Sequence, residues 1–268
     1  MSSGVISYMP IERGNGGNSY ANLWRYHASM TAERLTTLRA HDGFEMPAFV
    51  AIPDAGHGPG MVVIQEIFGV TDYIRDVCRR LAGAGYVALA PALYARMDPA
   101  LELDERREDS LPRALEAGRS LDFQQAVDDA VAALEHVRAM AEVTDRRAGI
   151  IGFCLGGGIA YLVAAASDPD VAVCYYGSAI PGALDRAADI TSPLLFHFGE
   201  ADAYITAEQR ADVERAFSAR ENVAFHRHPG AGHAFDNHNA AMFHEPEAAR
   251  RSWPQTLSFL SRWFPVSR

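Results

Sequence analysis

Short apolar runs alternate with amphipathic segments along most of the chain. Six runs have the length and apolar content of buried strands, and they lie at residues 61–65, 86–90, 148–152, 171–176, 194–198 and 223–228. Segments with a helical repeat separate or follow them, and these lie at residues 72–84, 121–142, 155–166, 206–219 and 246–263. This alternation predicts the α/β class, with a mostly parallel sheet and helices on both of its faces.

The first part of the chain departs from this alternation. Apolar and other residues alternate over 44–52, and Asp42-Gly43 predicts a hairpin turn that pairs this strand with residues 33–40. Residues 1–30 contain a glycine- and asparagine-rich stretch typical of a loop. We therefore predict an N-terminal extension over 1–30 and a single domain over 31–268.

Two segments carry irregularities. Leu101 to Arg119 is rich in charges, and we predict a solvated lid or cap helix there. Pro254 lies inside the last helical segment, so the pattern leaves open whether the helix starts late or bends at that point.

The sequence Gly152-Phe153-Cys154-Leu155-Gly156 joins a predicted strand to a predicted helix. Glycines at both ends permit a turn so tight that a Cβ atom would strike its neighbours. Such an elbow, in which serine is the usual nucleophile, exposes the Cys154 sulfur next to a helix N-terminus, where a thiolate is favoured. The alternative is a core cysteine beside a glycine-rich loop.

An elbow of this kind is followed along the chain by an acid and then by a histidine. Asp202 comes just after the strand at 194–198, and His233 just after the strand at 223–228. In an open parallel sheet, residues in these positions meet at the edge where ligands bind. We expect His233 to take the proton of the Cys154 thiol and Asp202 to orient and stabilise the imidazole.

Each of these two assignments has an alternative. Asp202 could be the N-cap of the following helix, and Glu200 in the same loop is a rival acid. His233 could be a turn residue between glycines. Three coincidences in the required order favour the catalytic interpretation over any of these.

The chain resembles the dienelactone hydrolase family over about residues 35–264. The resemblance lies in five motifs, namely the strand and loop at Val62–Val70, the segment Pro91–Arg96, the elbow at Gly152–Gly157, the segment Cys174–Gly177 and the segment Gly232–Phe235. It implies the α/β-hydrolase fold. It also implies hydrolysis of a small lactone or carboxylic ester of the carboxymethylenebutenolidase type, through a Cys-His-Asp triad with no metal and no organic cofactor.

The resemblance also implies further roles near the nucleophile. Glu66 would contact the resting thiol and help to activate it when substrate arrives, and the N–H groups of Leu155 and Ile67 would form the oxyanion hole. A carboxylate directly after an apolar strand is costly to bury unless something binds it, which agrees with a special role for Glu66. A buried structural ion pair is the alternative.

Substrate recognition is where the sequence differs from the family. Relatives that cleave dienelactone hold the substrate carboxylate with two arginines, and Arg96 matches the first, with Tyr94 beside it as a further candidate contact. The second position is Asn237, whose amide cannot form a bidentate charged pair with a carboxylate. Arg96 could instead be a solvated surface residue, so the resemblance leaves the substrate class open.

Two other functions stay open. A non-catalytic ligand-binding module could use the same fold, and another hydrolase could cleave a thioester or a carbon–halogen bond. The expected partner is a small-molecule ester or lactone. A homo-oligomer is compatible with the sequence, which does not fix the number of subunits.

The composition narrows the class of protein. The 268 residues, 49% of them hydrophobic, suffice for one large core. The chain has 34 acidic and 24 basic residues and a net charge of −10, which disfavours binding to nucleic acid or to an anionic membrane. All the basic residues are arginines, so a Schiff-base lysine and a phosphate-loop lysine are excluded.

The cysteines and histidines suggest neither a disulfide framework nor a metal centre. Cys78, Cys154 and Cys174 are odd in number and lack zinc-ligand spacing, and the first and last fit core positions. His226 and His228 could share one face of a strand, but they lack partners with convincing spacing. The start of the chain lacks a signal-peptide pattern and free cysteines fit a reducing compartment, so we expect a cytoplasmic protein.

Overall fold

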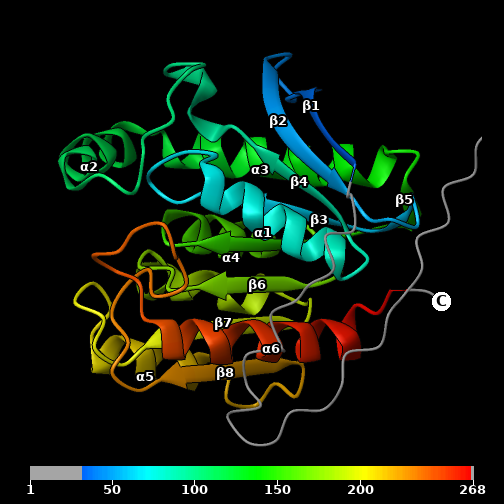
Figure 1. Cartoon of the computed structure of the whole chain (residues 1–268). Coiled ribbons are helices and arrows are strands. Elements are labelled where there is room, and N and C mark those ends of the chain that lie inside the picture. Colours follow the sequence, from blue (N-terminus) through cyan, green and yellow to red (C-terminus); the bar gives the residue numbers. More distant parts are fainter. Residues whose placement is uncertain (1–31, 267–268) are drawn as a thin grey trace, which may run out of the picture.

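A computed structural model of the chain describes residues 32–266 and shows one mixed β-sheet (Figure 1). The predicted extension over residues 1–30 lies outside the described residues. The sheet has eight strands, which are β1 Ala32–Arg39, β2 Glu45–Ile52, β3 Gly58–Ile64, β4 Val87–Pro91, β5 Val143–Phe153, β6 Ala172–Tyr175, β7 Leu194–Gly199 and β8 Val223–His228. The predicted strands are confirmed, and β5 begins five residues before its apolar run.

The strands lie in the order β1-β2-β4-β3-β5-β6-β7-β8. The β1–β2 hairpin is the predicted one, with Gly43 at a φ of 91° in its turn, and it joins the sheet antiparallel to β4. From β4 to β8 all neighbours are parallel. Their carboxyl ends therefore meet at one edge, towards which the arrowheads of β6 and β8 point in Figure 1.

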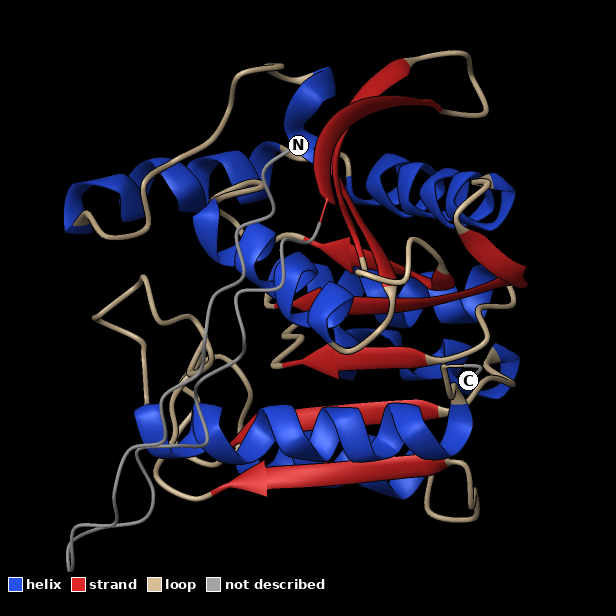
Figure 2. Ribbon diagram, turned by 45° about the vertical axis from the view of Figure 1, so that its right-hand side comes forward, coloured by secondary structure: helices blue, strands red, loops and turns tan. Residues whose placement is uncertain are grey.

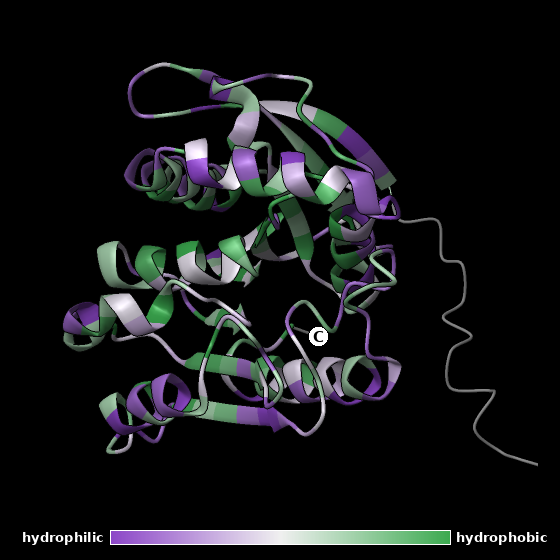
Figure 3. Ribbon diagram, turned by 90° about the vertical axis from the view of Figure 1, so that its left-hand side faces the viewer, coloured by the Kyte–Doolittle hydropathy of each residue, from purple (hydrophilic) through white to green (hydrophobic). Residues whose placement is uncertain are grey.

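Helices cover both faces of the sheet (Figure 2). The apolar side chains of α3 (Phe123–Ala139), α4 (Leu155–Ala166) and α5 (Ala207–Ala216) pack into one buried layer. Those of α1 (Asp72–Gly83) and α6 (Pro246–Trp263) pack into the other. In Figure 3 the central strands are largely green (hydrophobic), as expected for strands that are buried on both faces. The helices carry both green and purple (hydrophilic) positions, as expected for helices that are buried on one side.

Several local predictions can be compared with this fold. Cys78 in α1 and Cys174 in β6 are fully buried, as their patterns predict. The helix α6 is continuous from Pro246 to Trp263 with Pro254 inside it. None of the helices among residues 32–266 combines the length and the hydropathy that a membrane span needs.

The charged insertion is less solvated than its composition suggests. Its second half forms the 3₁₀ turn Glu108–Ser110 and the helix α2 (Leu111–Ser120), and another 3₁₀ turn, Leu93–Arg96, precedes the segment. Phe68, Leu103 and Ala114 form a small buried cluster where α2 meets the loop after β3. A minority of apolar positions on one helix face is enough to dock it, which the high overall charge of the segment conceals.

Candidate active site

The predicted elbow is present between the last residue of β5 and the first residue of α4. Cys154 has φ 54° and ψ −113°, a strained conformation that costs a non-glycine residue on the order of 1–3 kcal/mol. A Cβ atom on Gly152 would lie 1.9 Å from the Gly156 carbonyl oxygen, and one on Gly156 would lie 2.5 Å from the Ile64 oxygen. Both glycines are therefore required by close backbone contacts.

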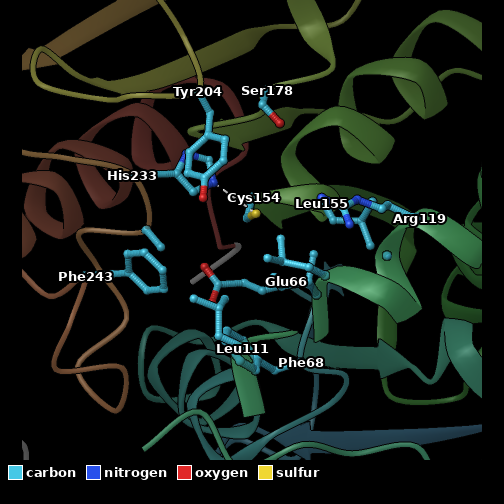
Figure 4. A pocket seen from close by; sticks show the side chains of 14 residues that line it. Glu66, Phe68, Leu111, Arg119, Cys154, Leu155, Ser178, Tyr204, His233 and Phe243 are labelled. Carbon is cyan, nitrogen blue, oxygen red and sulfur yellow. Dashed lines mark hydrogen bonds between the residues drawn. The ribbon is translucent and has the colours of Figure 1, made fainter. Parts of the chain in front are cut away.

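The structure brings the three predicted residues into one chain of contacts. His233 Nε2 lies 3.0 Å from Cys154 Sγ (Figure 4), and His233 Nδ1 lies 2.8 Å from Asp202 Oδ2. The other carboxylate oxygen, Oδ1, accepts a 2.7 Å hydrogen bond from the Tyr204 N–H. Both oxygens of Asp202 are thus engaged, which fixes the carboxylate against the imidazole.

The alternatives for the acid do not fit the geometry. The N-cap of α5 is Thr206, which forms a reciprocal capping box with Gln209, so Asp202 has no capping role. Glu200 is exposed, whereas Asp202 is 6% exposed. The residue at 202, two positions further from β7 than its rival, is the one that reaches the imidazole.

The surroundings of His233 favour a protonated imidazole. Burial lowers the pKa of His233, but the charge and hydrogen bonds of Cys154 and Asp202 outweigh this effect and raise that pKa to about 11. The Tyr204 and Tyr176 rings lie beside the imidazole, with centroid separations of 4.7 and 5.4 Å. An imidazolium held next to sulfur is the arrangement that keeps a catalytic cysteine as thiolate.

Glu66 lies beside these contacts, but its hydrogen bond is to Asn237. Its side chain is buried, and its Oε2 accepts a 2.6 Å hydrogen bond from Asn237 Nδ2. Among the described residues, the hydrogen-bond partner of the Cys154 sulfur is His233, so the implied contact between Glu66 and the resting thiol is absent. Burial, partly opposed by Asn237 and by the charge of His233, raises the pKa of the Glu66 carboxyl group to about 7.

The two residues whose N–H groups are expected to form an oxyanion hole both line the cavity. Ile67 and Leu155 line it, and within residues 32–266 neither backbone N–H has a hydrogen-bond partner. Tyr94, predicted as a substrate contact, instead donates a 3.0 Å hydrogen bond to the Ile67 carbonyl oxygen. The buried Tyr94 therefore fixes the loop that carries one of the two donors.

Arg96 does not reach the cavity. Its guanidinium donates hydrogen bonds of 2.8–2.9 Å to Asp42 and to the buried Asp129, and it stacks over the Phe44 ring at 4.4 Å. These contacts raise the pKa of Arg96 above its ordinary value, and the hydrogen bond to Asp129 has the largest effect. The predicted contact between Arg96 and a substrate is therefore not supported, because its donors are occupied by partners that lie far away in the sequence.

The hydrogen-bonding groups of Asn237, a predicted substrate contact, also have partners within the protein. It is 1% exposed, and its Oδ1 accepts hydrogen bonds from the backbone N–H groups of Asn239 and Ala240, while its Nδ2 binds Glu66. Asn237, where the resemblance implies an arginine in relatives that cleave dienelactone, thus contacts a glutamate.

A cavity of about 190 Å³ opens in front of the sulfur (Figure 4). Its polar lining includes Glu66, Cys154 and His233, and Arg119 from α2. Its apolar wall includes Ile67, Phe68, Leu111, Leu115, Leu155 and Phe243.

Arg119 is a cavity residue that the sequence patterns did not single out. Among the described residues it has no hydrogen-bond or ion-pair partner, unlike Arg96. Leu111, Leu115 and Arg119 repeat every four residues, so one face of the predicted lid helix was visible in the sequence.

The described residues contain no group of three or more candidate metal ligands. His228 Nε2 lies 3.0 Å from His197 Nδ1, inside the protein, and His197 Nε2 contacts Thr256. The pair at 226 and 228 therefore belongs to the packing of β7, β8 and α6.

Comparisons with known proteins agree with this geometry. A sequence model of the dienelactone hydrolase family matches residues 46–264. The carboxymethylenebutenolidase of Pseudomonas sp. (strain P51) is 36% identical over 230 residues, which are 86% of this chain and 95% of that protein. Carboxymethylenebutenolidase 1 of Cupriavidus pinatubonensis is 34% identical over 206 residues, or 77% of this chain and 87% of that protein.

Solved structures show the same likeness. A crystal structure from Klebsiella pneumoniae, named as a candidate dienelactone hydrolase, superposes with a TM-score of 0.75 at 30% identity and covers 87% of this chain and 100% of that one. The dienelactone hydrolase-like phosphotriesterase P91, at 24% identity and a TM-score of 0.69, shares the fold. The chain therefore belongs to the dienelactone hydrolase family and is a hydrolase with the α/β-hydrolase fold.

Proposed function

We propose that the chain hydrolyses a small carboxylic ester or lactone with Cys154 as nucleophile, His233 as base and acid, and Asp202 as the residue that orients the imidazole. The observation that carries this proposal is the unbroken contact chain from sulfur to imidazole to carboxylate, at 3.0 and 2.8 Å, with the sulfur facing the cavity. The names of the relatives, carboxymethylenebutenolidases, support a lactone as the substrate class.

In the first half-reaction the Cys154 thiolate attacks the carbonyl carbon of the substrate. The carbonyl electron pair moves to oxygen, and the oxyanion is held by the N–H groups of Leu155 and Ile67, each worth about 3 kcal/mol of barrier. The intermediate then collapses, the C–O bond breaks, and the leaving oxygen takes the proton held by His233. A thioester on Cys154 remains.

In the second half-reaction water takes the place of the alcohol. His233 accepts a proton from water as its oxygen attacks the thioester carbonyl, and the same two N–H groups hold the new oxyanion. Breakage of the C–S bond releases the carboxylic acid and restores the thiolate beside the imidazolium. With a lactone, both halves of the substrate leave as one hydroxy acid.

The apolar wall sets the kind of substrate that fits. Leucine and phenylalanine side chains line the cavity that the sulfur faces. Activated esters and lactones react with a thiol more readily than amides do. The free cysteines Cys78 and Cys174 are sealed in the core, which fits our expectation of a reducing compartment such as the cytoplasm.

The decisive experiment is a screen of aryl esters and small lactones against the wild-type chain and Cys154→Ala. We expect hydrolysis by the wild type and its loss in the variant. In parallel, iodoacetamide should modify one residue quickly in the wild-type protein and none in Cys154→Ala, because Cys78 and Cys174 are inaccessible. Near wild-type turnover by Cys154→Ala, or slow and equal labelling of all three cysteines, would refute the mechanism.

A further inference from the structure

The carboxyl group of Glu66 has one free oxygen at the wall of the cavity. The residue is 2% exposed, and Oε1 has no hydrogen-bond partner within residues 32–266. In Figure 4 the carboxyl group reaches into the space between Cys154, Phe243 and Leu111. A buried polar atom left without a partner is costly, so an oxygen in this position points to a group that a ligand supplies.

The neighbour of Glu66 determines where a proton would sit. Asn237 Oδ1 accepts hydrogen bonds from the N–H groups of Asn239 and Ala240, at 3.0 and 3.1 Å, so the amide cannot be flipped. Its Nδ2 must therefore face Glu66, where it donates to Oε2 at 2.6 Å. Because Oε2 is occupied as an acceptor, a protonated Glu66 carries its hydrogen on Oε1.

Glu66 pairs with no cation among the described residues. The ionisable groups that act on it are His233 after β8, Tyr176 after β6 and Glu105 in the insertion, and Cys154 and Arg119 line the same cavity. The Asn237 hydrogen bond and the positive charge of His233 lower the pKa of Glu66, but burial outweighs them and raises it to about 7.

We propose that Glu66 is a substrate-binding acid, whose Oε1–H donates a hydrogen bond to a second acceptor oxygen that the substrate carries beside its scissile carbonyl. The preferred substrate is then an ester or lactone whose acyl part bears a further carbonyl or carboxylate oxygen. This inference rests on the proposed hydrolysis at Cys154. It differs from the thiol-activating role that the family resemblance implies, because that role needs a carboxylate anion.

Glu66→Gln is the informative variant. Its amide oxygen would take the place of Oε2 and accept from Asn237, which leaves the amide N–H₂ in the place of Oε1, as a donor that does not titrate. In the wild type, kcat/KM for p-nitrophenyl levulinate should fall as the pH rises through about 7, by roughly 30-fold at pH 8.5, because the donor is lost. In Glu66→Gln this fall should disappear, with kcat/KM at pH 6 within about threefold of the wild type.

The substrate pair separates binding from catalysis. p-Nitrophenyl pentanoate lacks the second oxygen, so the preference for levulinate over pentanoate should be kept in Glu66→Gln and lost in Glu66→Ala. Glu105→Gln is the matched control, since Glu105 is a buried glutamate that binds Asn239 and does not line the cavity. It should keep the preference and the fall in kcat/KM, with the fall shifted to a somewhat lower pH because the charge of Glu105 raises the pKa of Glu66.

Two kinetic results and one spectroscopic result would overturn the proposal. A folded Glu66→Gln as inactive as Cys154→Ala would mean that an anion is needed at this position, and an unchanged fall above pH 7 would assign that fall to another group. A readout independent of turnover is the infrared C=O stretch of a protonated carboxyl group, which should be present at pH 6 and absent in Glu66→Gln. Absence of this band in the wild type would refute the proposal even if no ester were hydrolysed.

Discussion

Asp202→Asn changes one atom that contacts the imidazole and leaves the shape of the loop unaltered. The asparagine Oδ1 can still accept from the Tyr204 N–H, so its Nδ2 must face His233 Nδ1, where the carboxylate oxygen now lies at 2.8 Å. The imidazole can then satisfy this donor only with Nδ1 unprotonated. Its remaining proton moves to Nε2, which faces the sulfur and can no longer accept the thiol proton.

The size of the effect follows from the loss of two roles of Asp202, which are to hold the imidazole in the correct tautomer and to stabilise its charged form. The same substitution in a serine protease triad, an example from general enzymology, lowers kcat about 10⁴-fold because the wrong tautomer is held. We expect a loss of 10³–10⁴-fold here, or about 4–5 kcal/mol of barrier. Loss of the carboxylate also removes one of the groups that raise the pKa of His233.

Two assays measure these effects separately. Hydrolysis of p-nitrophenyl esters gives kcat, and the rate of iodoacetamide labelling as a function of pH reports how much of Cys154 is thiolate. At neutral pH the wild type should be labelled faster than Asp202→Asn, because without the carboxylate the imidazole no longer holds the positive charge that favours the thiolate. Glu200→Gln is the matched control from the same loop and should change kcat less than about twofold.

The reasoning would fail if Asp202→Asn retained activity within about tenfold of the wild type, or if Glu200→Gln lost it. Either result would mean that the contact at 2.8 Å does not set the tautomer of His233.

Three further predictions concern stability. Gly156→Ala places a Cβ atom 2.5 Å from a backbone oxygen, so we expect the free energy of unfolding in urea to fall by about 1–3 kcal/mol and kcat to fall with it, because the Cys154 turn must move. Arg96→Ala leaves the buried Asp129 without its ion-pair partner, so it should destabilise the fold by about 1–3 kcal/mol while KM stays within about twofold. Burial raises the pKa of Glu66 from 4.5 to about 7, so its stabilising contribution is complete below pH 4.5 and is lost as the pH rises through 7; Glu66→Gln should therefore raise the free energy of unfolding at pH 8, relative to pH 4.5, by roughly 2–3 kcal/mol.

Each of these has a clear contrary result. A Gly156→Ala protein with unchanged stability and activity would show that the elbow can relax around a methyl group. A large increase in KM for Arg96→Ala would place that side chain at the substrate after all. Equal effects of Glu66→Gln at both pH values would mean that Glu66 ionises in its ordinary range.

The elbow and the two loops that serve it could be predicted because their signals are local. Glycines at 152 and 156, an apolar strand before them and a helix after them are visible in a few residues, and the carboxyl ends of parallel strands meet at one edge. Asp202 and His233 follow from the same rule. The position of each reacting group depends on where a strand ends, which the apolar pattern marks well.

The partners of Arg96, Tyr94 and Asn237 could not be predicted in this way. Arg96 pairs with residues 54 and 33 positions away, and Asn237 with one 171 positions away. A short motif fixes which side chain is present, but not which side chain faces it once the sheet has formed. The resemblance therefore suggested substrate contacts at positions where the structure shows hydrogen bonds that hold the protein together.

The proposed catalytic triad and part of the cavity wall belong to separate parts of this architecture. Cys154, Asp202 and His233 follow the carboxyl ends of strands, whereas Leu111, Leu115 and Arg119 of the wall belong to α2. In Figure 1, α2 lies on the left, the side towards which the arrowheads of β6 and β8 point. A Cβ atom on Gly118 of α2 would approach the Ile67 side chain at 3.0 Å, so even one methyl group there would narrow the chamber. Substitutions in the ten-residue helix α2 can thus change substrate selectivity without touching Cys154, Asp202 or His233. This makes α2 the natural target for a library of variants that seeks new substrates.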